Sequence, residues 1–205
     1  MLLNNIFLRT QRYGYMIRLA IFASGEGTNA QRFIEYYKSR QDVNISLIVT
    51  GNPNAKVIKR AVDMGIPYLV IEKNAFYNTG DVVAILKQKA DFIVLAGFMW
   101  MVPVNLIKAF PNKMVNIHPA LLPKYGGKGM YGLNVHRAVI ANKEKRSGIT
   151  IHFVNENYDE GKIIYQAECK VEEMDTPETL ANRIHALEHE YYPVIVERLL
   201  LGNIS

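Results

Sequence analysis

Asn116 and His118 are the residues whose types and spacing first indicate chemistry. They stand in the apolar run Met114-Val-Asn-Ile-His118, immediately before Pro119, which cannot donate a hydrogen bond to a strand ladder. In a strand, side chains two positions apart point to the same side, so a carboxamide and an imidazole would face one reacting atom. This pattern predicts a proton-transfer site. A buried, hydrogen-bonded core histidine is the alternative.

The second polar feature is the turn Ser24-Gly-Glu-Gly-Thr-Asn29. Backbone amides of a short glycine-rich turn approach an anion closely, and a following helix adds partial positive charge at its N-terminus. The turn therefore predicts a phosphate site. It lacks the third glycine of a dinucleotide fingerprint and the Gly-Lys-Ser/Thr of a P-loop. A tight turn with a helix cap remains the other interpretation.

The composition is that of one or at most two globular domains, with 205 residues, 49% of them hydrophobic and 21% charged. A net charge of +5 is too mild for a nucleic-acid binder and fits small anionic substrates better. The single Cys169 excludes an internal disulfide and a cysteine-based metal site. We expect a cytoplasmic protein without a metal. No apolar run approaches the roughly 18 residues of a membrane span, so no membrane association is expected.

Apolar strands alternate with helical segments along most of the chain. The sequence predicts strands at Arg18–Ala23, Ile45–Thr50, Tyr68–Ile71, Phe92–Ala96 and Met114–Ile117. Helices are predicted between them at Asn29–Lys38, Ala55–Met64, Gly80–Lys89 and Pro103–Phe110. Continuously apolar strands with intervening helices predict an α/β fold, with a mostly parallel sheet covered on both faces and a Rossmann-like N-terminal half.

The C-terminal part adds two strands and a long helix. The strands are predicted at Gly148–Val154 and Lys162–Val171, the second as an antiparallel edge. Thr176 followed by proline and glutamate opens a helix that extends to about Leu201. We expect residues 1–15 to be a disordered extension and residues 16–205 to form a single domain.

With these pieces in place, the chain resembles the folate-dependent formyltransferases. The resemblance covers nearly all of residues 16–205, and its motifs are Leu95-Ala-Gly-Phe-Met99, Asn116-Ile-His-Pro119, Leu121-Leu-Pro-Lys-Tyr125, His152-Phe-Val154, Asp159 with Gly161, and Glu188-His-Glu-Tyr-Tyr-Pro193. The Gly-Thr-Asn turn and the Glu-His-x-x-Tyr-Pro segment point to members that act on a ribonucleotide.

The resemblance implies transfer of a formyl group from the co-substrate 10-formyltetrahydrofolate to the amine of 5-phosphoribosylglycinamide, in purine biosynthesis. Asn116 and a protonated His118 would each donate to the tetrahedral oxyanion, and His118 would protonate the leaving folate nitrogen. Asp159 would favour the charged form of the ring. Without the resemblance, the acidic loop around Asp159 would be interpreted as a solvated turn.

Binding residues also follow from the resemblance. Gly27, Thr28 and Asn29 would hold the substrate phosphate, and Glu188 would contact the sugar hydroxyls. The folate would lie, largely through backbone groups, against Asn116 and two segments, which comprise Met99, Trp100, Met101 and Val102, and Asn155, Glu156, Asn157, Tyr158 and Asp159. The apolar segment could equally be packed core or a subunit contact.

Three features depart from the family pattern. Trp100 stands where the family usually has arginine, and Thr79 stands near the position where some members place an arginine for the folate glutamate. Contacts to the folate tail are therefore not carried over. The glycine-rich segment Gly126–Gly132 is longer than in some relatives and is expected to be a mobile cover, in which Lys128 is most simply a solvated loop lysine.

The sequence leaves three alternative functions open. Hydrolysis of 10-formyltetrahydrofolate would use water in place of the amine, but that enzyme usually carries an additional regulatory domain. Formylation of initiator tRNA would normally need a C-terminal basic domain. A non-catalytic phosphate- or folate-binding module would not need the proton-transfer residues. As partners we expect only the two small-molecule substrates, and the chain would be a monomer or a weak homodimer.

Overall fold

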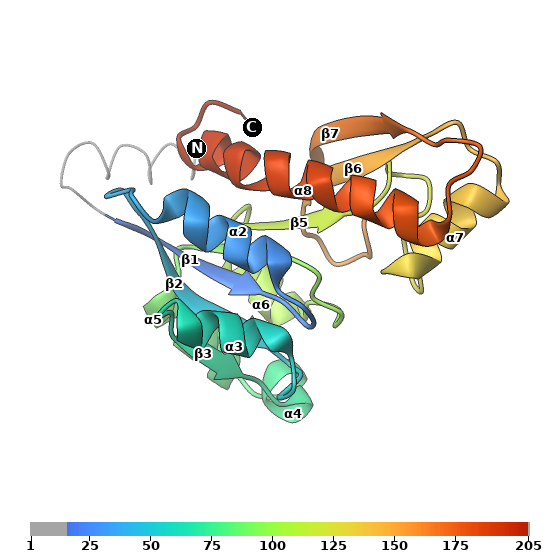
Figure 1. Cartoon of the computed structure of the whole chain (residues 1–205). Helices are drawn as coiled ribbons and strands as arrows, with labels where there is room; N and C mark the ends of the chain where they lie inside the picture. The colour runs from blue at the N-terminus through green and yellow to red at the C-terminus, as the bar shows by residue number, and fades with distance from the viewer. Residues whose placement is uncertain (1–15, 205) are drawn as a thin grey trace.

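The structure, a computed structural model, describes residues 16–204; the extension predicted for residues 1–15 lies outside the described residues. A seven-stranded sheet of order β3-β2-β1-β4-β5-β6-β7 forms its centre (Figure 1). The strands are β1 (Ile17–Phe22), β2 (Val43–Thr50), β3 (Tyr68–Val70), β4 (Phe92–Leu95), β5 (Met114–His118), β6 (Arg146–Phe153) and β7 (Ile163–Lys170). The helices are α2 (Thr28–Tyr37), α3 (Lys56–Asp63), α4 (Lys73–Tyr77), α5 (Asp81–Lys89), α6 (Val104–Ala109), α7 (Leu133–Ala141) and α8 (Pro177–Leu200).

The first five strands are parallel, and β6 and β7 are antiparallel to their neighbours. The predicted α/β fold and the antiparallel edge strand are therefore confirmed. The chain passes from β1 outward through β2 to β3, and then returns to the other side of β1 as β4. In such sheets the carboxyl ends of the strands at this reversal border a crevice where ligands bind.

The alternation of side chains in β1 divides the core into two layers. Leu19 and Ile21 pack into the cluster that contains residues of α2, α3 and α8, whereas Ala20 and Phe22 pack into the cluster with α4, α5 and α6. Figure 1 shows α2, α3 and α8 in front of the sheet and α5 and α6 behind it. Helices on both faces explain why apolar side chains point to both sides of these strands.

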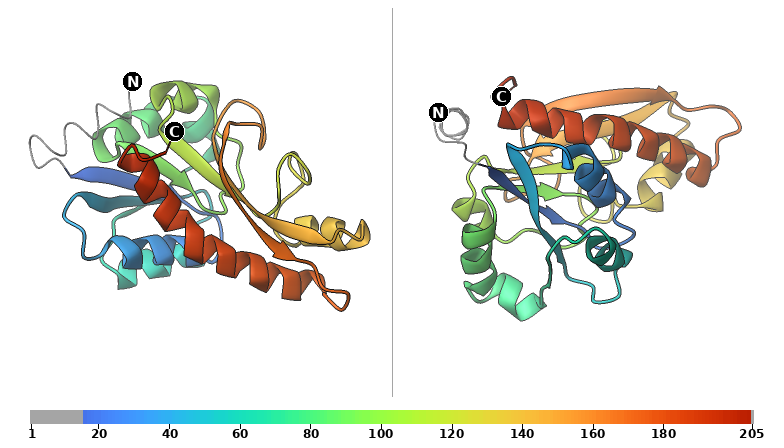
Figure 2. Two further views of the ribbon diagram at one scale, coloured as in Figure 1. Left: turned by 90° about the horizontal axis from the view of Figure 1, so that it is seen from above. Right: turned by 60° about the vertical axis from the view of Figure 1, so that its left-hand side comes forward.

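Helix α8 connects the two halves of the molecule. It packs against α7, β6 and β7 at one end and against α2 farther along, and Figure 2 shows it lying across the sheet between these elements. Its N-terminus is the predicted one, because the Thr176 hydroxyl accepts a hydrogen bond from the Thr179 N–H at 3.2 Å and Pro177 occupies the first turn.

Two helices, α4 and α7, were not predicted from the sequence. Helix α4 has five residues and α7 has nine; neither lies between two of the predicted parallel strands as the only connecting helix, which is the pattern by which the other helices between strands were predicted. Helix α7 also follows the glycine-rich segment, whose Gly132 adopts a φ of 53° at the N-cap. Its omission mattered most, because α7 contributes a buried histidine to the site described next.

Candidate active site

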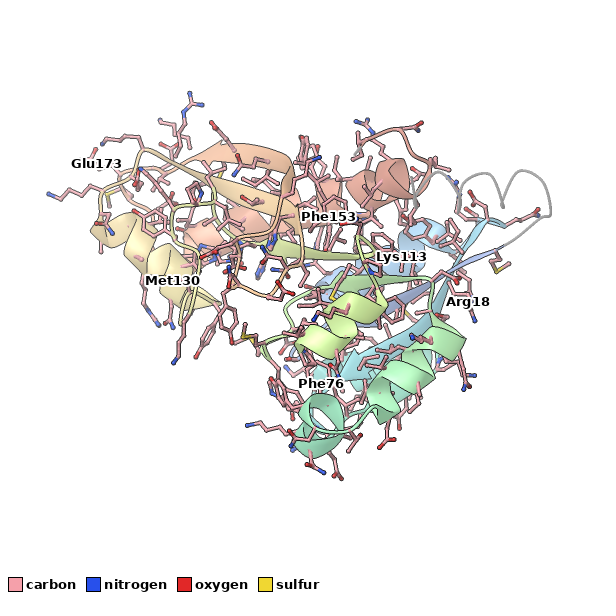
Figure 3. All side chains as sticks on the ribbon, turned by 180° about the vertical axis from the view of Figure 1, so that it is seen from behind. Arg18, Phe76, Lys113, Met130, Phe153 and Glu173 are labelled. Atoms are coloured by element: carbon pink, nitrogen blue, oxygen red, sulfur yellow. The ribbon has the colours of Figure 1, made fainter. Side chains whose placement is uncertain are left out.

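A cavity of about 510 Å³ opens at the carboxyl ends of β1, β4 and β5. Its lining comes from the turn after β1, the segment after β4, the end of β5, the loop 127–132, the loop 155–159, and one face of α8. In Figure 3 Met130 marks the loop that precedes α7. The glycine-rich segment predicted to be a cover therefore lies at the cavity, while its mobility remains a prediction.

Four polar side chains meet at the centre of this cavity. Asn116 Nδ2 lies 3.2 Å from His152 Nε2 and 3.5 Å from Asp159 Oδ1. His118 Nδ1 lies 3.5 Å from Asp159 Oδ2, and His152 Nε2 lies 3.6 Å from Asp159 Oδ1. The structure thus brings the predicted Asn116, His118 and Asp159 together. It adds His152, a residue that sequence reasoning had left out of the site.

Backbone carbonyls fix the protons on both histidine rings. His118 Nε2 lies 2.7 Å from the carbonyl oxygen of Tyr125, and His152 Nδ1 lies 2.8 Å from that of Phe153. Because a carbonyl only accepts, these two nitrogens must carry hydrogen. In its neutral form His118 therefore presents a bare Nδ1 to Asp159, while His152 presents a bare Nε2 to the Asn116 amide.

The pKa of His118 favours a neutral ring, whereas the family resemblance implies a protonated one. Burial lowers the pKa of His118 below its ordinary value, and the raising effects of the Asp159 carboxylate and the Tyr125 carbonyl do not compensate. Asp159 does favour the charged form of the ring, as expected, but His118 is 4% exposed, and the lost hydration of its cationic form outweighs this effect. The ring is therefore neutral at neutral pH.

Asp159 is ionised, and neighbouring groups stabilise its carboxylate. Burial raises the pKa of its carboxyl, but the neighbouring His152 and His118 rings and the Gly127 N–H together bring it below the usual value. Gly127 N donates to Asp159 Oδ2 at 2.9 Å. The residue has a φ of 55°, in the left-handed region where aspartate and asparagine are tolerated better than other side chains.

The turn after β1 has the conformation expected of an anion-binding turn. Gly27 caps α2 with a φ of 71°, and a Cβ there would lie 2.5 Å from Val57 Cγ2, so only glycine fits. Thr28 begins α2. The Glu26 carboxylate, which would repel a phosphate, instead pairs with Lys56 Nζ at 2.8 Å.

Asn29 and Glu188 form one buried pair rather than two independent contacts. Asn29 Nδ2 donates to Glu188 Oε2 at 2.8 Å, and burial raises the pKa of Glu188. Among the described residues, Asn29 Oδ1 has no hydrogen-bond partner. This pair lines the cavity from α2 and α8, and a buried acceptor without a partner is a group that a bound ligand could satisfy.

The opposite wall is apolar. Met99 and Met101 are exposed at 45% and 37%, and Val102 is buried. The indole of Trp100 packs near the rings of Phe76 and Phe98, with centroid distances of 5.7 and 6.0 Å. One backbone N–H of this segment is already hydrogen-bonded within the protein, because Met99 N donates to Ser24 Oγ at 3.0 Å. The segment is thus both core and cavity wall, which combines the two sequence interpretations.

The loop 155–159 contributes all but one of its predicted residues. Asn155, Asn157, Tyr158 and Asp159 line the cavity, whereas Glu156 does not. The Asn155 side chain accepts from the Asn157 N–H at 3.1 Å, which turns the chain and leaves Glu156 exposed at its apex. The predicted folate contact of Glu156 is therefore not supported. Lys128, interpreted as a solvated lysine, does line the cavity.

Two further histidines line the cavity and were missed. His136 of α7 is buried, its Nδ1 has no partner among the described residues, and burial followed by His185 and His118 lowers its pKa to about 4. His185 lies on the same face of α8 as Glu188. His136 could have been found from the sequence only if residues 133–141 had been predicted as a helix, because it lies on the buried face of α7 with Val135 and Val139.

Within residues 16–204, no helix has both the length and the apolar content needed to cross a bilayer. In the same part of the chain, no three histidine, cysteine, aspartate or glutamate side chains are grouped so that they could hold a metal ion.

Comparisons with known proteins agree with this geometry. Residues 17–196 match the family described as formyl transferase. The chain is 42% identical over 187 residues to the chloroplastic phosphoribosylglycinamide formyltransferase of Arabidopsis thaliana, covering 87% of this chain and 64% of the plant protein. It is 37% identical over 191 residues to the Bacillus subtilis phosphoribosylglycinamide formyltransferase, covering 90% and 95%. The chain thus spans less than two thirds of the length of the plant relative.

A solved structure is similarly close. The phosphoribosylglycinamide formyltransferase of Bacillus halodurans superposes with a TM-score of 0.80 at 40% sequence identity, over 89% of this chain and 95% of that one. The glycinamide ribonucleotide transformylase 1 of Symbiobacterium toebii superposes with a TM-score of 0.84 at 33% identity, over 92% and 90%.

Proposed function

The chain belongs to the formyl transferase family, and from this premise we propose that it transfers the formyl group of 10-formyltetrahydrofolate to the amine of 5-phosphoribosylglycinamide, a step of purine biosynthesis. The observation that carries the proposal is the position of the Asn116, His118, His152 and Asp159 cluster. It lies between a polar wall from α2, α7 and α8 and an apolar wall after β4. Such a cavity suits two substrates of different polarity.

The polar wall would bind the ribonucleotide. The Gly27–Thr28 turn offers backbone N–H groups at the start of α2 to the phosphate. Glu188 and the free Asn29 oxygen are acceptors, so they suit sugar hydroxyls better than a phosphate. We therefore propose that Asn29 acts with Glu188 on the sugar, and that Gly27 and Thr28 take the larger share of the phosphate contacts.

The apolar wall would hold the folate. Met99, Trp100, Met101 and Val102 present a surface for a flat heterocycle, and Asn155, Asn157 and Tyr158 face it from the other loop. Tyr77 Oη donates to the Met101 carbonyl at 3.1 Å, which leaves other backbone groups of the segment to contact the pterin.

In the proposed reaction the neutral amine attacks the formyl carbon and forms a tetrahedral intermediate. One N–H of the Asn116 amide bonds His152, and the second, which makes only a long hydrogen bond of 3.5 Å to Asp159 Oδ1, would donate to the oxyanion instead. The bare Nδ1 of neutral His118 accepts the proton that the attacking amine loses, and Asp159 stabilises the resulting imidazolium. The same proton then moves to N10 of the folate as the carbon–N10 bond breaks. His118 thus acts first as base and then as acid.

Related proposals follow from the same geometry. One continuous sheet with both faces covered supports a single domain for residues 16–205. A monomer or weak homodimer in the cytoplasm, with only these two small molecules as partners, remains a prediction from the sequence. A deformylase would need no polar wall for a ribonucleotide, so this wall favours the transferase.

The direct test gives purified protein 10-formyltetrahydrofolate with and without 5-phosphoribosylglycinamide. We expect tetrahydrofolate to be released only when the ribonucleotide is present, because the amine is the formyl acceptor. Absorbance follows folate release, and mass spectrometry identifies the formylated ribonucleotide. Release at an equal rate without the ribonucleotide would establish the deformylase instead.

The proposed sugar contact predicts a selective effect on one substrate. Glu188→Gln is expected to raise KM for the ribonucleotide about 10-fold or more, since hydrogen bonds to a charged group contribute about 1.5–3 kcal/mol. KM for the folate and kcat should change little. The control is Glu190→Gln, an exposed position on the same helix. Equal changes in the KM values of both substrates would contradict the assignment.

A further inference from the structure

His118, Thr150 and Gln166 form a row across three neighbouring strands. His118 of β5 is the register partner of Thr150 of β6, which in turn is the partner of Gln166 of β7. Thr150 is fully buried, so its hydroxyl must find partners within the protein. Those partners lie in the segment that follows His118.

The Thr150 hydroxyl binds this segment at two points. Thr150 Oγ1 donates to the Ala120 carbonyl at 2.7 Å and accepts from the Leu122 N–H at 3.0 Å. Packing reinforces these bonds: a Cβ on Gly148, two residues before Thr150 on β6, would lie 2.7 Å from Leu121 Cδ2. The segment 120–122 therefore packs directly against β6.

Gln166 completes the network from the edge strand. Its Nε2 donates to Thr150 Oγ1 at 2.9 Å and to the Leu122 carbonyl at 3.0 Å. The hydroxyl of Thr150 then makes one donated and two accepted hydrogen bonds, which is its full capacity. A saturated network around the buried Thr150 hydroxyl holds one geometry, because a displacement of the segment leaves a polar group of Thr150, Ala120 or Leu122 unpaired.

The chain continues from this segment to the backbone carbonyl that orients the His118 ring. Three residues after Leu122, the carbonyl of Tyr125 accepts the hydrogen of His118 Nε2. We propose that Thr150 and Gln166 are positioning residues for His118, which hold the segment 120–122 so that the Tyr125 carbonyl keeps the proton on Nε2 and leaves Nδ1 free. The catalytic part of this inference rests on the proposed function, whereas the effect on the ring does not.

Thr150→Val tests the network with almost no change of shape. It removes the hydroxyl and leaves the Leu122 N–H and the Ala120 carbonyl unpaired. We expect kcat to fall about 10- to 100-fold, as for a catalytic group displaced by about 1 Å, with both KM values nearly unchanged. Thr150→Ser restores the hydroxyl and should recover most of kcat. Wild-type kcat in the valine variant, or equal loss in the serine variant, would overturn the proposal.

The pH profile separates positioning from a loss of folding stability. The groups that face His118 are Asp159, His152 and His136, and they are unchanged in the variants. Because the Tyr125 carbonyl raises the pKa of His118, its displacement should move the acid limb of kcat/KM to lower pH in Thr150→Val. A lower melting temperature with an unmoved acid limb would mean that Thr150 only stabilises the fold.

Gln166→Leu provides a second variant that does not disturb the core. Gln166 is exposed on the edge strand, so its replacement should fold even if Thr150→Val does not. We expect the same direction of change with a smaller loss of kcat. The matched control is Glu168→Gln, two residues along β7, which pairs with Arg146 at 2.5 Å outside the network. Wild-type kinetics in Gln166→Leu would remove Gln166 from the proposal.

Imidazole ¹⁵N spectra test the inference without any assay of turnover. In the wild-type protein the neutral His118 ring should show a single tautomer with its proton on Nε2. In Thr150→Val we expect a mixture of tautomers and a lower titration midpoint, whereas Thr150→Ser should resemble wild type. Unchanged spectra in the valine variant would refute the positioning role. An absence of formyl transfer by the wild-type protein would refute only the proposed function.

Discussion

Replacing His118 by alanine is expected to lower kcat by about 10²- to 10⁴-fold, the range that a positioned general acid–base contributes. The bare Nδ1 that faces Asp159 at 3.5 Å would be lost, and with it the route of the proton from the amine to the leaving folate nitrogen. KM for both substrates should stay within a few-fold of wild type, because the ring acts on the transition state rather than on the ground state. Steady-state kinetics against each substrate provide the measurement.

Two further observations make the His118 prediction specific. Free imidazole should restore part of the activity of His118→Ala, because the deleted ring leaves space in the cavity. In the wild-type protein, the acid limb of kcat/KM should lie below the ordinary histidine pKa, since burial lowers the pKa of His118 and the neutral ring is the reactive form. An acid limb above the ordinary value would show that the charged ring reacts first.

The pKa of His118 shows one limit of reasoning from the sequence. Period-two alternation correctly placed Asn116 and His118 on one side of β5, and both now line the cavity. The sequence also indicated an acid for the ring. The net pKa could not follow from it, because the loss of hydration depends on burial by segments that lie far apart in the chain, such as the loop that contains Asp159.

His152 and Glu156 show a second limit. His152 enters the site because β6 pairs with β5 in a register that sets it opposite Asn116, and register between strands that are not joined by a short turn cannot be obtained from one sequence. Glu156 does not line the cavity, because a local hydrogen bond turns its loop. The family resemblance predicts a role for the whole loop and does not distinguish residues that line the cavity from those that face outward.

The strands were the most predictable part of the fold. Runs such as Phe92–Leu95 are apolar at every position because helices cover both faces of the sheet. The cavity was less predictable, since its polar wall combines α2, α7 and α8. Helix α7 was not predicted from the sequence, and the position of the buried His136 could therefore not be predicted either.

Replacing Asp159 by asparagine is expected to lower kcat by about 10²-fold or more, within the range of acid–base catalysis. Asparagine is the matched replacement because the φ of 55° at this position suits it and would strain alanine. The amide removes the negative charge that stabilises the imidazolium in the transition state, while the Gly127 N–H can still find a carbonyl oxygen. The substrates should therefore still bind.

The pH dependence of this variant distinguishes charge from geometry. Asp159 raises the pKa of His118, so its loss should lower that pKa further and move the acid limb of kcat/KM to lower pH, while kcat falls at every pH. Glu160→Gln is the control, because Glu160 is exposed and bonds only Asn157 among the described side chains. A kcat within a few-fold of wild type in Asp159→Asn would mean that His118 carries the proton without a counter-charge, and the shared role assigned to the pair would then be wrong.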